Sequence, residues 1–146
     1  MADFLAPAER SALMALIRGK GNASTELRLV ALLRAAGIRG WRRGSRLPGR
    51  PDFAFAAERL AVFVDGCFWH GCPRHHRLPR TRRAFWRAKV LGNRRRDRRV
   101  DRELRARGWS VLRIWEHELR AARLGSTLRR LRRVLTAARA PQSSLR

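Results

Sequence analysis

An excess of positive charge limits what this chain can become. Its 146 residues carry 35 lysines and arginines against 11 acids, which gives a formal net charge of +24. Self-repulsion of that size opposes a compact state unless counterions or a polyanion screen it. Hydrophobic residues still make up 45% of the chain, enough for a folded core. We therefore expect one globular domain with a charged surface and nucleic acid as its leading partner.

The basic residues are concentrated in one segment. Between residues 74 and 107 the sequence holds fifteen basic residues and three acids. A proteome rich in arginine would raise the total charge, but it does not explain this placement. Lysine occurs only at Lys20 and Lys89, and the planar guanidinium of arginine suits bidentate contacts with phosphate.

The sequence has no apolar run near ~18 residues and no signal-peptide pattern, so it predicts neither a membrane span nor export. We expect a cytoplasmic protein. The only cysteines are Cys67 and Cys72, and in a reducing compartment such a close pair is more often half of a metal site than a disulfide.

Apolar periodicity and turn residues predict a mixed α/β fold in a single domain, 1–146, with an N-terminal helix or arm at 1–20 and a flexible tail at 137–146. The expected helices cover residues 8–18, 24 to about 36, 84–107 with a break or bend near Gly92, and 119–135. The expected strands cover residues 53–55, 60–64 and 109–115. This order implies a mixed sheet flanked by helices.

Two carboxylates stand in apolar surroundings. Asp52 begins the strand at 53–55, and Asp65 ends the strand at 60–64. If these strands pair as a hairpin, both acids reach the same edge of the sheet, where two carboxylates would suit Mg²⁺. The alternative is that each acid merely forms a turn next to Pro51 or Gly66.

A loop rich in cysteine and histidine follows. Cys67, Cys72 and His75 have the spacing C-x4-C-x2-H, and His117 lies just past the third strand, which predicts a tetrahedral zinc site. Two buried cysteines without a metal are the alternative, and His76 competes with His75. Another histidine of this loop, His70, could be a general base, a zinc ligand or a surface residue.

Aromatic residues crowd the same region, at Phe68, Trp69, Phe85 and Trp86. Large rings in a cationic stretch are either core anchors or wedges that stack against displaced bases. Composition alone favours the core.

With these residues in view, the chain resembles the very short patch repair endonucleases over about residues 18–119. The matching motifs are RGKGN before the helix of Glu26, LPGRPDF around Asp52, VDGCFWH from Val64 to His70, Phe85-Trp86, residues 93–101 and residues 108–116.

The resemblance implies a fold similar to restriction endonucleases. It implies Asp52 and the carbonyl of Val64 as Mg²⁺ ligands, His70 as general base and Glu26 as a helix glutamate of the active site. Asp65 falls where some members carry histidine, so its role as metal ligand or water-orienting group stays open. The zinc ligands carry over as Cys67, Cys72, His75 and His117, the last in place of a cysteine. The intercalating aromatics would be Phe68, Trp69 and Trp86, which reverses the preference for the core.

The implied function is an Mg²⁺-dependent endonuclease that nicks double-stranded DNA 5′ to the thymine of a T·G mismatch left by deamination of 5-methylcytosine. Arginines including Arg94 and Arg95 would hold the duplex. We expect a monomer that acts on the bacterial nucleoid, with repair accessory proteins as further partners. The alternatives are a restriction-type nuclease of the same fold with another specificity and a non-catalytic, zinc-containing DNA-binding module.

Overall fold

The computed structural model describes residues 25–67, 71–73 and 77–139. Its elements are α2 (Thr25–Ala35), β1 (Trp41–Arg42), β2 (Phe53–Phe55), β3 (Leu60–Asp65), α3 (Arg83–Ala106), β4 (Ser110–Trp115), the 3₁₀ turns η1 (Glu116–Leu119) and η2 (Ala121–Arg123), and α4 (Leu124–Arg139). The mixed α/β class is confirmed. The helix expected at 8–18 lies outside the described residues. Among the helices described, none is both long and apolar enough to cross a bilayer.

The four strands form one mixed sheet in the order β1-β2-β3-β4. β2 and β3 are antiparallel, with Phe53 opposite Val62, which confirms the expected hairpin. β3 and β4 are parallel, with Phe63 opposite Arg113. A parallel pair needs a long crossover, and α3 lies within this one.

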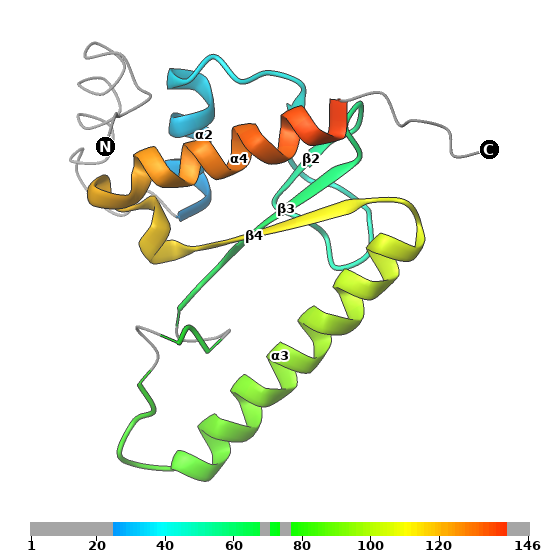
Figure 1. Cartoon of the computed structure of the whole chain (residues 1–146). Helices are drawn as coiled ribbons and strands as arrows, with labels where there is room; N and C mark the ends of the chain where they lie inside the picture. The colour runs from blue at the N-terminus through cyan, green and yellow to red at the C-terminus, as the bar shows by residue number, and fades with distance from the viewer. Residues whose placement is uncertain (1–24, 68–70, 74–76, 140–146) are drawn as a thin grey trace.

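Helices cover both faces of the sheet (Figure 1). α2 and α4 pack on one face, where leucines of both helices meet the inward side chains of β2, β3 and β4. The second half of α3 covers the other face, where Leu104 and Val100 pack on Ala61 and Phe63. Because side chains alternate along a strand, Val62 and Val64 face the first core while Phe63 and Asp65 lie on the α3 side.

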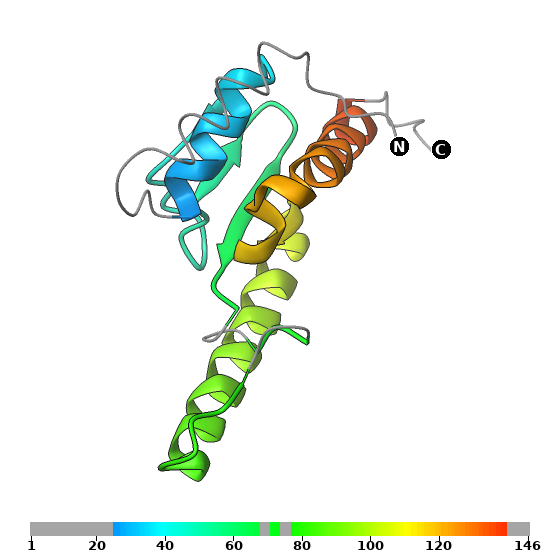
Figure 2. The same cartoon turned by 90° about the vertical axis from the view of Figure 1, so that its left-hand side faces the viewer.

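The expected break in the long helix is wrong, because α3 runs from Arg83 to Ala106 without interruption. Gly92 is exposed, and a Cβ added there would meet no atom of the described residues outside its helix within 4 Å. The glycine therefore costs the helix only about 1 kcal/mol in helix propensity. The first half of α3 extends beyond the sheet, and residues 71–73 and 77–82, which belong to the connection from β3 to α3, run beside it (Figure 2). That segment packs closely there, because a Cβ on Gly71 would lie 2.9 Å from Cγ1 of Val90.

The last helix also differs from expectation. Residues 116–123 form two 3₁₀ turns, and α4 begins only at Leu124. Thr127 explains part of the shift, because its hydroxyl donates to the carbonyl of Glu118 at 2.7 Å and holds the turn against the helix. Residues 137–139, expected in the flexible tail, belong to α4.

We predict that Gly49→Ala destabilises the fold. Gly49 has φ 74°, and an added Cβ would overlap the side chain of Val100 on α3. Backbone strain and overpacking together should lower the free energy of unfolding by about 1–3 kcal/mol, measured by denaturant titration. Gly92→Ala is the matched control and should stabilise the protein by up to about 1 kcal/mol. Equal stability of Gly49→Ala and the unmodified protein would contradict this packing.

Candidate active site and metal centre

Asp52 is fixed where β2 begins and β3 ends. Its Oδ2 accepts a hydrogen bond from the backbone N–H of Val64 at 2.7 Å. The contact crosses the hairpin, so the antiparallel register itself brings the carboxylate to the end of β3. The predicted hairpin therefore does bring Asp52 to the end of β3. The contact is with the N–H of Val64, and the role of the Val64 carbonyl as a metal ligand stays a prediction.

The surroundings of Asp52 favour a cation beside it. Burial raises the pKa of the Asp52 carboxyl above its usual value, the N–H of Val64 opposes this, and the charge of Glu26 adds to the rise. Burial disfavours the ionised form of such a carboxylate, and a positive charge bound next to it stabilises that form.

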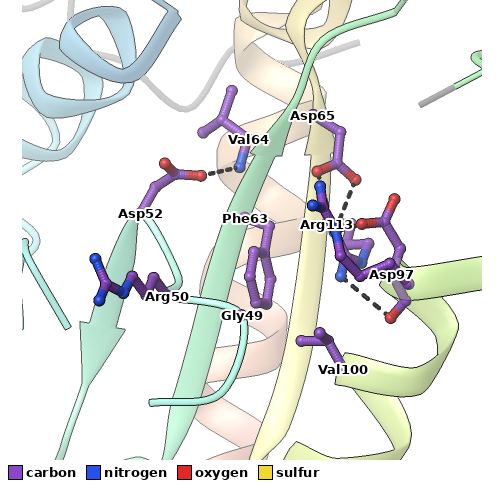
Figure 3. A pocket seen from close by; sticks show the side chains of 10 residues that line it. Gly49, Arg50, Asp52, Phe63, Val64, Asp65, Asp97, Val100 and Arg113 are labelled. Atoms are coloured by element: carbon purple, nitrogen blue, oxygen red, sulfur yellow. Dashed lines mark hydrogen bonds and ion pairs between the residues drawn. The ribbon is translucent and has the colours of Figure 1, made fainter. Parts of the chain in front are cut away.

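Two hollows border Asp52. One, of about 510 Å³, is lined by Asp52, Val64 and Asp65 among others (Figure 3). The other, of about 660 Å³, brings in Glu26 from α2. Glu26 also pairs with Arg43, whose Nε and Nη2 both lie 2.9 Å from its Oε1. The structure thus brings Glu26 and Asp52 to a common hollow, although they are 26 residues apart in the sequence.

Arg50 lines both hollows. Its φ of 50° is left-handed, a conformation that a residue before proline rarely adopts. The turn that imposes it is closed by the N–H of Arg50, which donates to the carbonyl of Leu47 at 2.9 Å. Strain of this kind is often found at functional sites.

Asp65 lies in the first hollow but does not share the contacts of Asp52. It is buried, and both of its oxygens accept from Nη1 of Arg113, at 3.0 and 3.1 Å. Arg113 also binds Asp101 of α3 and lies near Asp97. Sequence reasoning missed Arg113, although an arginine in the middle of the apolar strand SVLRIW is itself a signal.

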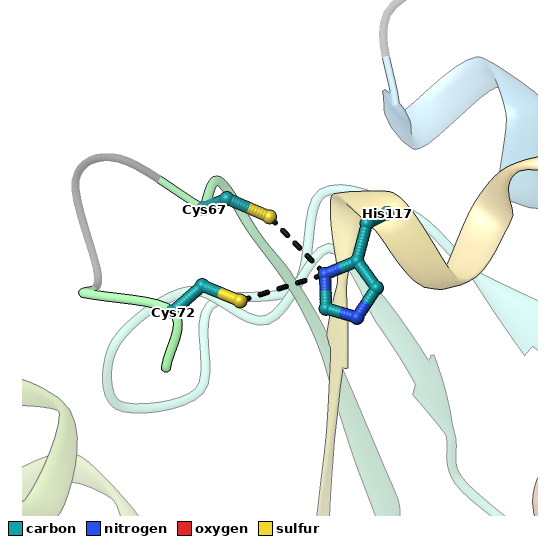
Figure 4. A group of neighbouring side chains, drawn as sticks. All are labelled: Cys67, Cys72 and His117. Atoms are coloured by element: carbon teal, nitrogen blue, oxygen red, sulfur yellow. Dashed lines mark hydrogen bonds between the residues drawn. The ribbon is translucent and has the colours of Figure 1, made fainter. Parts of the chain in front are cut away.

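A second candidate site lies where the segment after β3 meets η1. Cys67, Cys72 and His117 are buried, and their ligand atoms all lie within 4.8 Å of one another (Figure 4). Nδ1 of His117 is 3.3 Å from Sγ of Cys67 and 3.5 Å from Sγ of Cys72. The predicted association of these three residues is confirmed, and they could hold a metal ion.

Local contacts explain how these residues meet. The N–H of Cys72 donates to the carbonyl of Cys67 at 2.9 Å, which closes the loop. The N–H of Cys67 donates to the carboxylate of Glu116 at 2.9 Å, next to His117 in η1. Burial raises the pKa of the Cys67 thiol to about 11, and the neighbouring Cys72 adds to the rise. A metal would therefore have to displace a proton from Cys67.

The comparisons decide the family. A family model described as DNA mismatch endonuclease Vsr matches residues 2–76. The chain belongs to this family. The type II nicking enzyme V.XorIIP of Xanthomonas oryzae pv. oryzae is 42% identical over 92% of this chain and 98% of its own length. The DNA mismatch endonuclease Vsr of Escherichia coli strain K12 is 41% identical over 82% of this chain and 77% of its own length. The nicking enzyme V.HpaIIP of Haemophilus parainfluenzae is 32% identical over 77% and 82%.

The long helix of this Vsr-family chain carries basic and aromatic groups. Arg94 and Arg95 are exposed, and Trp86 is half-buried. The ring of Phe85 is 40% exposed and meets Trp86 edge to face, with 5.1 Å between centroids. The guanidinium of Arg82 lies over Phe85 at 4.3 Å. Phe85 and Trp86 thus form a partly exposed aromatic pair among cations.

Several predicted site residues lie outside the described residues, namely His70, His75, His76, Phe68 and Trp69. The fourth zinc ligand, the general base and two of the three expected intercalating rings are therefore still predictions.

Proposed function

We propose that the protein nicks double-stranded DNA 5′ to the thymine of a T·G mismatch that arises from deamination of 5-methylcytosine, and so starts very short patch repair. Membership of the Vsr family supports this proposal. The observation that carries it is the Asp52 carboxylate, held by Val64 between two hollows in a strongly basic chain.

The chemistry we propose is hydrolysis of one phosphodiester bond. The oxygen of water bonds to phosphorus, the bond from phosphorus to one sugar oxygen breaks, and that oxygen takes up a proton. Asp52 and the carbonyl of Val64 would hold Mg²⁺, since hard oxygen donors suit that ion. Bound Mg²⁺ would stabilise negative charge on the phosphate. His70 would remove the proton from the water.

Glu26 and Arg50 complete the proposed site. Glu26 borders the same hollow as Asp52 and adds negative charge that favours a bound cation. Arg50 lines both hollows, so a phosphate placed next to Asp52 would come close to its guanidinium. An arginine there would offset the charge of the phosphate.

Duplex binding would depend on the basic helix α3. Arg94 and Arg95 are exposed on it, and Arg96 lines the first hollow. Such contacts give affinity that falls steeply with salt and does not depend on sequence. Phe68, Trp69 and Trp86 would enter the base stack at the mispair, where unstacking costs less because pairing is already poor.

The Cys67–Cys72–His117 cluster would hold a structural zinc ion, with His75 or His76 as fourth ligand. Sulfur and imidazole donors suit zinc rather than magnesium. The ion would fix the loop that carries His70 and the two aromatic residues against the end of β4. We further propose that the protein works as a monomer on the bacterial chromosome, in the cytoplasm, and that repair accessory proteins take over the nick.

The proposed specificity predicts one nick in a T·G duplex. With Mg²⁺ and end-labelled strands, we expect cleavage of the thymine strand only, at a rate at least about 10²-fold above that of the matched duplex, because unstacking a paired base costs a few kcal/mol more. The control duplexes carry T·A and the other mismatches in the same sequence.

Other outcomes would identify the alternatives. Cleavage of both strands of a matched duplex would replace mismatch repair with a restriction-type nuclease. Binding of every duplex without cleavage of any would leave a DNA-binding module.

A further inference from the structure

We propose that Arg113 is a positioning residue that clamps α3 to the catalytic edge and keeps the Asp65 carboxylate from competing for the metal. This inference rests on the proposed function. It assigns a role to Arg113, and it replaces the roles that the sequence left open for Asp65 with that of an anchor.

Arg113 lies on β4 and joins this strand to β3 and α3 through contacts with Asp65, Asp97 and Asp101, and we call these four residues the Arg113 clamp. On β3, Asp65 accepts from its Nη1 at 3.0 and 3.1 Å. On α3, Asp101 accepts from its Nε at 3.0 and 3.1 Å and from its Nη2 at 2.7 Å. Asp97, one turn earlier on α3, has a carboxylate oxygen 3.7 Å from Nη1 and a carbonyl that accepts from Nη2 at 3.4 Å. The planar guanidinium can bridge these groups because its donors point in different directions.

The register of the sheet fixes Arg113 in this place. Arg113 lies opposite Phe63, and its guanidinium is 4.2 Å from the centre of the Phe63 ring. The side chain is only 21% exposed, and those of Asp65, Asp97 and Asp101 are 6%, 18% and 17% exposed. Ion pairs with so little water between them are screened weakly by salt.

The clamp can affect catalysis because it connects the proposed catalytic edge of the sheet with the basic helix α3. Asp65 and Arg113 line the same hollow as Asp52, and Asp97 and Asp101 lie on the helix that carries Arg94 and Trp86. The position of the DNA-binding half of α3 relative to Asp52 is therefore set through Arg113. Small displacements of reacting groups reduce rates strongly.

The clamp also defines what Asp65 can do. Both of its oxygens accept from Arg113, so the guanidinium offsets the charge of Asp65 and competes with a metal for these oxygens. Without Arg113, a buried carboxylate that lines the same hollow as Asp52 would lose the cation that both of its oxygens contact. Such a group would draw the metal away from its productive position.

The test compares Arg113→Met with Arg139→Met. Arg139 pairs with Glu58 at 2.7 Å, and the Glu58 side chain is 6% exposed, as that of Asp65 is. Both variants thus remove a guanidinium from a buried carboxylate, but Arg139 and Glu58 line neither hollow next to Asp52. Both should lower the melting temperature, and Arg113→Met should lower it further because Arg113 contacts three carboxylates whereas Arg139 pairs with Glu58. Arg139→Met therefore controls for the loss of one buried ion pair.

The readout is the single-turnover nicking rate of a T·G duplex at saturating enzyme and a temperature where both variants are folded. We expect Arg113→Met to lose about 10–100-fold, since misplacement by about 1 Å can cost 10²-fold. Arg139→Met should keep the rate. Equal rates in the two variants would overturn the clamp, whereas a wild-type protein that nicks no T·G duplex would overturn the proposed function.

Asp65→Asn gives a second, independent measurement. As an anchor, Asp65 is not needed to bind the metal, so the Mg²⁺ concentration for half-maximal nicking should stay within about twofold of wild type. In Arg113→Met the freed carboxylate should shift that concentration, and Arg113→Met with Asp65→Asn should restore it. A tenfold or larger shift in Asp65→Asn alone would make Asp65 a metal ligand and overturn this part of the proposal.

Discussion

Asp52→Asn is expected to abolish nicking while the protein stays folded. The substitution keeps the shape of the side chain and an oxygen that can accept from the N–H of Val64. It removes the negative charge that would hold Mg²⁺ next to the phosphate. We expect the single-turnover rate on a T·G duplex to fall by about 10³-fold or more, as when a main electrostatic contact of a transition state is lost.

Stability separates this loss from unfolding. Burial raises the pKa of Asp52 in the folded protein, so its ionised form is disfavoured there relative to the unfolded chain. The resulting penalty appears as the pH rises past the unfolded pKa and is complete once the pH exceeds the raised pKa of the folded state. A neutral asparagine does not carry it. The melting temperature of metal-free Asp52→Asn at pH 7 should therefore equal or exceed that of the unmodified protein.

Glu58→Gln is the matched control. It exchanges another largely buried carboxylate for an amide, in the turn between β2 and β3, and Glu58 lines neither hollow. Glu58→Gln should be less stable than the unmodified protein, because the ion pair with Arg139 is lost, and it should keep the nicking rate. If Asp52→Asn nicks as fast as Glu58→Gln, Asp52 does not bind the catalytic metal.

The hairpin was predictable from sequence because local signals agreed. Pro51 ends a turn before a short aromatic strand, and the run from Leu60 is apolar enough to be buried on both faces. An antiparallel pair then places Asp52 at the end of β3 without further information. β1 escaped notice because a strand of two residues has no periodicity to detect.

Long-range polar contacts were not predictable in the same way. Asp97 and Asp101 look like solvated charges on a basic helix, and only the crossover through α3 turns them toward Arg113. Their spacing of four residues puts them on one helix face, a signal that gains meaning only with a partner. The start of α4 was misjudged for a related reason, because Thr127 bonds to the carbonyl of Glu118 across nine residues.

His117→Ala is expected to release the metal, loosen the loop and stop nicking, although Asp52 is untouched. Cys67, Cys72 and His117 converge from the loop after β3 and from the turn after β4, so a metal bound by all three would join these two segments. Loss of a structural metal should cost at least about 3–5 kcal/mol of stability. Metal content per chain and thermal unfolding measure the two effects directly.

His117→Cys is the decisive control, because cysteine is an equally good zinc ligand and preserves the donor count. It should retain the metal, the melting temperature and most of the nicking rate.

Metal binding should also depend on pH. Because a metal must displace the proton of Cys67, whose pKa is raised to about 11, the affinity of the site for the metal should rise by about tenfold per pH unit for that proton. If His117→Ala keeps both metal and stability, His117 is not a metal ligand. Contacts such as the close packing of Gly71 on Val90 would then remain to hold the segment after β3 against α3.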